Sequence, residues 1–180
     1  MQSRPVTSRP RAALWALSLA MFAVGTASLI VLGAGQEMTD DLGVAPGSAG
    51  WLMTTFAATF ALAAPLAQWL LAGQWPQSRI VLAGLLLLAG SLFWAALAQS
   101  FGILILTRAF AAMGGAMIAP TSAALAVTLV PADHRARALA TVFAGFTLAS
   151  VLGVPLGTWL SLSLGWRGAM AAIGCVALIA

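Results

Sequence analysis

Charged residues are scarce in this sequence, which sets the first limits on what the protein can be. Only 7% of its 180 residues are charged, whereas soluble domains carry about 25%. Lysine is absent, and the net charge of +4 comes from eight arginines spread along the chain. So few charges do not cover a soluble domain with water-facing surface, and the arginines are too scattered for a nucleic-acid-binding patch.

Cysteine and histidine are nearly absent as well. Cys175 is the single cysteine and His134 the single histidine, which excludes an intramolecular disulfide and argues against a metal site. The apolar segments also lack paired carboxylates and a nucleophile with an adjacent base, the groups that an intramembrane hydrolase needs. We therefore expect no cofactor, no metal and no enzymatic activity.

What the chain does have is apolar sequence. Hydrophobic residues make up 62% of it and the mean hydropathy is +1.02. The apolar stretches are continuous and do not alternate with polar residues at a period of two, so they are typical of membrane-spanning helices and not of barrel strands. The fold class expected is an all-α, polytopic helical membrane protein.

A window of about 19 residues locates the expected helices. A tail over 1–13 precedes a transmembrane domain over 14–180, with helices at about 14–32, 49–70, 80–98, 103–129 and 137–160, and an incomplete sixth at 168–180. Spanning a bilayer takes about 20 residues, so the sixth helix has about half the required length. We expect the sequence to be a fragment; a complete short protein is the alternative.

The distribution of charge predicts the orientation. Most arginines flank one set of helix ends, which the positive-inside rule assigns to the cytoplasm together with the N-terminus; they are Arg4, Arg9, Arg11, Arg79, Arg135 and Arg137. The opposite ends carry Glu37, Asp40 and Asp41, which we expect in a solvated loop. The first apolar segment is also compatible with a secretory signal that would be cleaved at the small residues 33–35.

Small residues recur every fourth position in GFTLASVLGVPLGTWL, residues 145–160. They are Gly145, Ala149, Gly153 and Gly157, with Pro155 among them. Inside lipid, helices associate through close van der Waals contact, which a face of small residues permits. The pattern predicts a tight contact with another helix and a kink at Pro155.

Arg108 is the one charged residue well inside an expected span. A mid-membrane arginine costs about 2.5–3.5 kcal/mol on insertion scales, so such residues usually face a cavity or a partner. Arg108 is therefore a candidate for the pathway of a substrate or proton. The alternative is a structural arginine bonded to backbone carbonyls.

These motifs resemble those of the major facilitator superfamily. The 145–160 stretch is similar to its antiporter signature in helix five, and LGWRGAM, residues 164–170, to its entry into helix six. Three further stretches fit in the same order: GWLMTTFAATFALAAPLA in helix two, RAFAAMGGAMIAPTSAALA in helix four and PADHRARALA in the following loop. The chain resembles the N-terminal, six-helix half of a bacterial drug:proton antiporter or sugar-efflux protein.

The resemblance implies a twelve-helix transporter of two halves, with substrate bound between them near the membrane midplane. It places Arg108 at a position associated with proton coupling or substrate contact. It places Gly153, Pro155 and Gly157 in the antiporter signature, on a face that contacts the other half. In the cytoplasmic loop, residues 71–84, this chain retains the family's Gly73 and Arg79 but has no acidic residue.

The expected function is therefore transport across the bacterial inner membrane. It would be proton-linked efflux of a small organic solute, such as a drug, a sugar or an amino-acid derivative, by alternating access. The expected partners are that solute, protons, the lipid bilayer and a C-terminal six-helix half, with no nucleic acid. The alternative is a truncated half that does not transport, or a structural membrane module. Helix one has Ser28 where related efflux proteins carry a glutamate. None of the other expected spans contains a carboxylate either.

Overall fold

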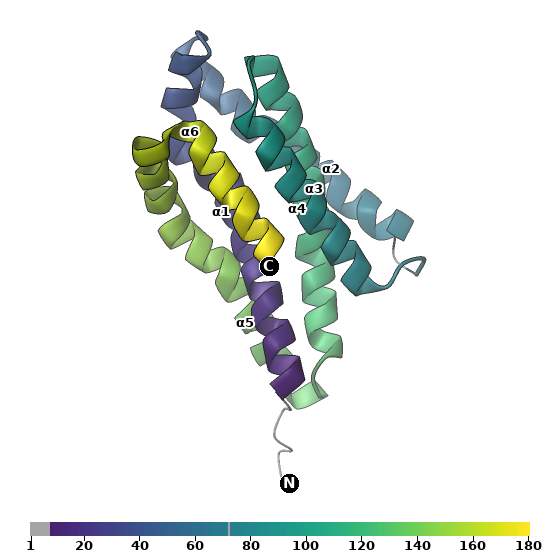
Figure 1. Cartoon of the computed structure of the whole chain (residues 1–180). Helices are drawn as coiled ribbons and strands as arrows, with labels where there is room; N and C mark the ends of the chain where they lie inside the picture. Colours follow the sequence, from purple (N-terminus) through teal and green to yellow (C-terminus); the bar gives the residue numbers. More distant parts are fainter. Residues whose placement is uncertain (1–7, 72) are drawn as a thin grey trace.

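The chain folds into a bundle of long helices, as the apolar segments predict. A computed structural model describes residues 8–71 and 73–180 (Figure 1). Its α-helices are α1 (Ser8–Asp41), α2 (Ala49–Leu71), α3 (Gln77–Ala96), α4 (Phe101–Thr128), α5 (Arg135–Leu148) and α6 (Val154–Ile179). Two single 3₁₀ turns, η1 (Pro46–Ser48) and η2 (Ala132–His134), and a π-helical turn, η3 (Ala149–Gly153), complete the described part. The all-α fold class is confirmed.

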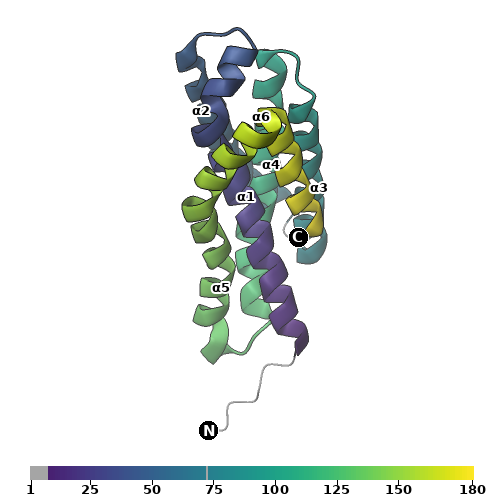
Figure 2. The same ribbon diagram turned by 60° about the vertical axis from the view of Figure 1, so that its left-hand side comes forward.

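Helix α1 lies at the centre of the bundle. It packs against α5 and α6 on one side and against α4 on another, while α2 and α3 lie along α4 (Figures 1 and 2). Ala23, Ala27 and Ile30 of α1 are completely buried. Small side chains on α1 let its neighbours approach closely, which is how helices associate without a hydrophobic driving force in lipid.

The first helix is longer at both ends than the 14–32 expected from hydropathy. It begins at Ser8, so residues 8–13 of the expected tail are helical, and it continues through the acidic residues to Asp41. The hydropathy window detects only the part of a helix that lies in hydrocarbon. The polar end continues as helix because its carboxylates find partners on α6.

The fifth and sixth expected helices, 137–160 and 168–180, form one helical run with a sharp reversal. The run begins at Arg135, widens at η3 and continues as α6 to Gly165, where φ is 70° and ψ is 162°. Only glycine adopts this conformation readily. Pro155 lies just beyond the π turn: because a proline cannot donate the next helical hydrogen bond, the expected kink takes the form of a wider turn.

The described part of the chain has five helical segments long and apolar enough to cross a membrane. They cover Arg11–Asp41, Ala49–Leu71, Gln77–Ala96, Phe101–Thr128 and Ala132–Ile179, the last including the reversal at Gly165. Large apolar side chains such as Trp69 and Leu162 are about four-fifths exposed. Soluble proteins do not surround themselves with such surface, and a lipid-facing bundle does.

Candidate functional site

Arg108 lies in the interior of the bundle, where it joins α4 to α1. Its guanidinium donates from Nη1 to the Ala27 carbonyl at 2.6 Å and from Nη2 to the Ser28 carbonyl at 3.1 Å. Its Cζ lies 4.7 Å from the centre of the Phe56 ring of α2. The side chain is 1% exposed, so a full positive charge is held between two backbone carbonyls and an aromatic ring.

Within residues 8–71 and 73–180, no carboxylate pairs with Arg108, and its Nε has no hydrogen-bond acceptor. Carbonyl dipoles and the face of Phe56 are what compensate the buried charge. The structure therefore contains the backbone contacts of the structural alternative. It also contains what a functional arginine needs, a charge whose compensation depends on the relative positions of three helices.

An apolar cavity of about 470 Å³ lies beside Arg108, and Phe56 is part of its wall. Its wall comes from α1, α2, α4 and α5 and includes Phe56, Phe60, Phe143 and Phe146. Phe56 and Phe60 stack with their ring centres 6.3 Å apart. Ser28 is the one residue with a polar side chain in the cavity wall, and its hydroxyl donates a hydrogen bond to the Gly25 carbonyl at 2.8 Å. Arg108 is not part of the cavity surface but lies one aromatic ring behind it.

The small-residue stripe packs against α1 of the same bundle. All four of its residues are buried within this bundle, against α1. A Cβ added to Gly145 would lie 2.7 Å from the Ser18 carbonyl carbon, and one added to Gly153 would lie 3.4 Å from the Thr26 hydroxyl. The stripe runs from α5 through η3 to the start of α6 and crosses α1 closely, and the Pro155 side chain is exposed.

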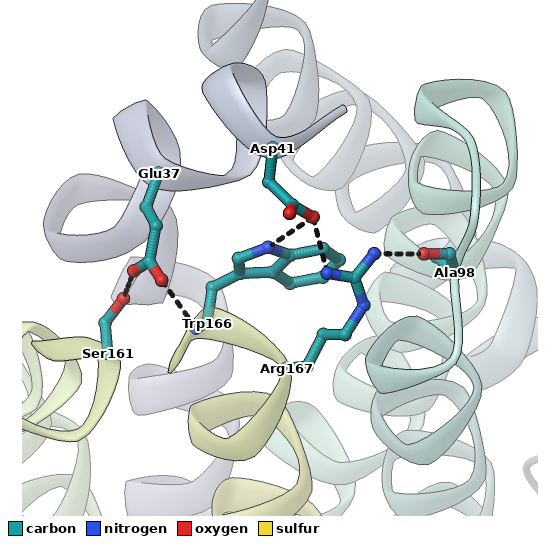
Figure 3. A network of polar contacts seen from close by, with 6 residues as sticks. All are labelled: Glu37, Asp41, Ala98, Ser161, Trp166 and Arg167. Carbon is teal, nitrogen blue, oxygen red and sulfur yellow. Dashed lines mark hydrogen bonds and ion pairs between the residues drawn. The ribbon is translucent and has the colours of Figure 1, made fainter. Parts of the chain in front are cut away.

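Two of the three outer carboxylates, Glu37 and Asp41, lie at the end of α1 and bond to α6, so the expectation of a solvated loop was wrong for them. Asp40 is exposed and accepts a hydrogen bond from the Gln36 amide at 3.0 Å. Glu37 accepts hydrogen bonds from the Ser161 hydroxyl and, at 3.2 Å, from the Trp166 backbone N–H (Figure 3). Asp41 accepts from the Trp166 indole N–H at 3.2 Å and pairs with Arg167. The two acids at the end of α1 therefore bond to α6 both before and after Gly165, and these bonds hold the reversal in place.

Arg167 extends the same network to a third part of the bundle. Its Nη2 donates to the Ala98 carbonyl at 3.0 Å, between α3 and α4, and its guanidinium lies over the Trp166 ring at 4.2 Å (Figure 3). We call Glu37, Asp41, Ser161, Trp166 and Arg167 the outer network. The sequence contained its signal, since acids at the end of one span and a Gly-Trp-Arg turn at the start of another belong to the same membrane surface.

Gly73 and Arg79 lie at the opposite end of α2 and α3, away from these contacts. Gly73 forms an exposed turn with a φ of 86°, and Arg79 is exposed in the first turn of α3. Neither residue lines the cavity. Among the described residues, no cluster of His, Cys, Asp and Glu has the arrangement of a metal site.

The sequence and structure can be compared with known proteins at this point. The family model described as Major Facilitator Superfamily matches residues 16–180. A chloramphenicol resistance protein of Streptomyces lividans is 37% identical over 160 residues, which are 89% of this chain and 41% of that protein. A chloramphenicol efflux pump of Mycobacterium tuberculosis is 32% identical over an aligned length of 186 residues, gaps included, which covers 99% of this chain and 45% of the pump.

Solved structures share the fold. A bacterial homologue of the human lysosomal transporter Spinster, inward-facing and unoccupied, matches with a TM-score of 0.76 and 23% identity over 99% of this chain and 43% of the homologue. A peptide transporter in complex with alafosfalin gives a TM-score of 0.80 and 15% identity, over 95% of this chain and 36% of the transporter. This chain thus spans less than half the length of each protein.

Proposed function

The chain belongs to the major facilitator superfamily, and we propose that it forms the N-terminal half of a secondary transporter that exports a small organic solute in exchange for protons. The observation that carries the proposal is the cavity of about 470 Å³ with Arg108 held behind its wall. A cavity between helices, near a buried charge, is the usual form of a transporter's binding site. The names of the two relatives suggest chloramphenicol as the first solute to test.

The surface of the bundle supports pairing with a second half. On α2, Leu62, Leu66 and Trp69 are more than half exposed, and on the other side of the cavity Val151 and Trp159 are as well. The first three belong to α2, which supplies part of the cavity wall, and the last two lie in η3 and α6, directly after α5, which supplies another part. A second six-helix bundle placed here would cover apolar surface and close the cavity at the same time.

The charges support insertion in the bacterial inner membrane with the N-terminus in the cytoplasm. Arg11 near the start of α1, Arg79 at the start of α3, and Arg135 and Arg137 at the start of α5 belong to one end of the bundle. The acids of the outer network belong to the other. The positive-inside rule assigns the arginine end to the cytoplasm.

A vesicle experiment tests the transport proposal. The complete product of the gene and the 180-residue chain are expressed separately, and chloramphenicol uptake into inverted vesicles is followed with and without an imposed pH gradient. We expect gradient-driven uptake with the complete product and none with the 180-residue chain alone. Uptake that is indifferent to the gradient would remove the proton-exchange part, and no uptake in any arm would favour a structural membrane module.

Arg108→Ala separates a functional from a structural arginine. We expect the variant to insert and purify like the parent but to lose gradient-driven transport, because the contact between α4, α1 and Phe56 depends on the guanidinium. Arg108→Lys restores the charge without the planar five-donor group, so it should recover transport only in part. Full transport by Arg108→Ala would contradict the functional role, and loss of folded protein would support the structural one.

A further inference from the structure

The chemistry of the cavity wall limits the charge of what can bind there. Four phenylalanines dominate the wall, and the hydroxyl of Ser28 is already committed to the Gly25 carbonyl. None of the residues that line the cavity carries a carboxylate. A cationic solute would therefore lose its hydration in this cavity without gaining a counter-charge, which is a large cost in an apolar environment.

The nearest fixed charge has the same sign as such a solute. Arg108 stands behind Phe56, with its Cζ 4.7 Å from the ring centre, and no described carboxylate neutralises it. Of the three acids of α1, all at its outer end, Glu37 and Asp41 are engaged with Trp166 and Arg167, and Asp40 accepts from Gln36. The positive potential of Arg108 at the cavity is thus reduced by the Ala27 and Ser28 carbonyl dipoles but is not cancelled by a described carboxylate.

The size of this effect follows from the distance. The guanidinium lies 4.7 Å from the centre of the Phe56 ring, so a solute about 3.5 Å from that centre is at most about 8 Å from the charge. At about 8 Å and an effective dielectric constant of about 20, a second positive charge is disfavoured about thirtyfold relative to a neutral solute of the same shape. The face of Phe56 already holds the Arg108 guanidinium, so cation–π attraction to a solute would come from the other phenylalanines of the wall.

We propose that this cavity selects neutral or anionic solutes with a flat apolar body, and that Arg108 excludes cations from behind the Phe56 wall. The inference rests on the proposed function in one respect, that the occupant of the cavity is the transported solute. It goes beyond that function because it names Arg108 as a residue that determines specificity by charge, without touching the solute.

Three compounds with two linked aromatic rings, nearly equal size and different charge test the proposal. Binding of 4-methylbiphenyl, biphenyl-4-carboxylate and 1-methyl-4-phenylpyridinium to the 180-residue chain in nanodiscs is measured by equilibrium dialysis, with empty nanodiscs subtracting the lipid contribution. We expect the neutral and anionic compounds to bind at least tenfold more tightly than the cation. Equal or tighter binding of the cation would overturn the proposal, as would absence of binding by all three.

Variants assign the selectivity to Arg108. Arg108→Gln should bring the cation to within about threefold of the neutral compound, whereas Arg108→Lys should keep the difference. If Arg108→Gln does not fold, Ala123→Asp places a carboxylate at the cavity surface, with Ala123→Asn as its uncharged control. The Asp variant should bind the cation at least tenfold more tightly than the Asn variant, and equal binding by the two would contradict the electrostatic account.

The binding assay and the transport assay test separate statements, so each can contradict its own statement without the other. Selective binding without gradient-driven uptake in vesicles would remove the proposed function and leave the charge selectivity of the cavity in place. Conversely, gradient-driven export of 1-methyl-4-phenylpyridinium would support the proposed function and overturn the inference.

Discussion

Adding one methyl group to the small-residue stripe should destabilise the bundle at one position and not at another. In Gly145→Ala the new Cβ would lie 2.7 Å from the Ser18 carbonyl carbon and closer still to its oxygen. Carbon atoms in good contact are about 3.5–4.0 Å apart. Helix α5 must therefore move away from α1 by about 1 Å, and the obstacle is backbone, which cannot rotate aside.

Gly153→Ala is the matched control, because it makes the same change on the same face. There the new Cβ would meet Thr26 at 3.4–3.5 Å, an ordinary contact. Replacing a helical glycine with alanine gains about 0.5–1 kcal/mol through the backbone, and overpacking costs about 1–3 kcal/mol. We expect Gly153→Ala to be neutral or slightly stabilising and Gly145→Ala to lose about 1–2 kcal/mol.

The assay is thermal unfolding of the purified chain in detergent, followed by tryptophan fluorescence and size-exclusion chromatography. The expected difference of about 1–3 kcal/mol between the two variants corresponds to about 2–12 °C in the unfolding midpoint for a chain of this size. Ser18→Ala should not rescue Gly145→Ala, since it removes the hydroxyl and leaves the carbonyl. Equal midpoints for Gly145→Ala and Gly153→Ala would refute the close crossing of α1 and α5.

Three further measurements examine the outer end of the bundle. Asp41→Asn should lower the unfolding midpoint slightly, because it weakens a half-exposed pair with Arg167. Asp40→Asn, which loses only an exposed bond from Gln36, is the control and should leave the midpoint unchanged. Gly165→Ala should cost about 1–3 kcal/mol, because alanine is strained at a φ of 70°, and a midpoint equal to that of the parent would show that the reversal relaxes. A cysteine-reactive fluorescent probe can be attached to Cys175, which is exposed on α6. If the outer network holds the second part of α6 in place, Asp41→Asn should change the signal of this probe. An unchanged signal would assign that role to helix packing alone.

Local chemistry was enough to predict the class of the protein and to single out several residues with unusual environments. Continuous apolar runs predicted an all-α membrane bundle because a backbone in lipid has to satisfy its own hydrogen bonds. The cost of burying a charge identified Arg108 as exceptional. Four small residues at helical spacing predicted a tight crossing, and the order of the motifs indicated the family.

The partners of these residues came only from the tertiary structure. A stripe of small residues shows that some helix lies close but not which one, and the bundle assigns it to α1 of the same half. Hydropathy does not distinguish a solvated acid from one that bonds to a helix 124 or more residues away, so the outer network was missed. Likewise, the sequence indicated a charge inside a span at Arg108, but only the packing of three helices brought that charge into contact with Phe56, a residue of the cavity wall. Spacing along a helix is a local property of the chain, whereas the identity of the surface it meets depends on how distant segments pack.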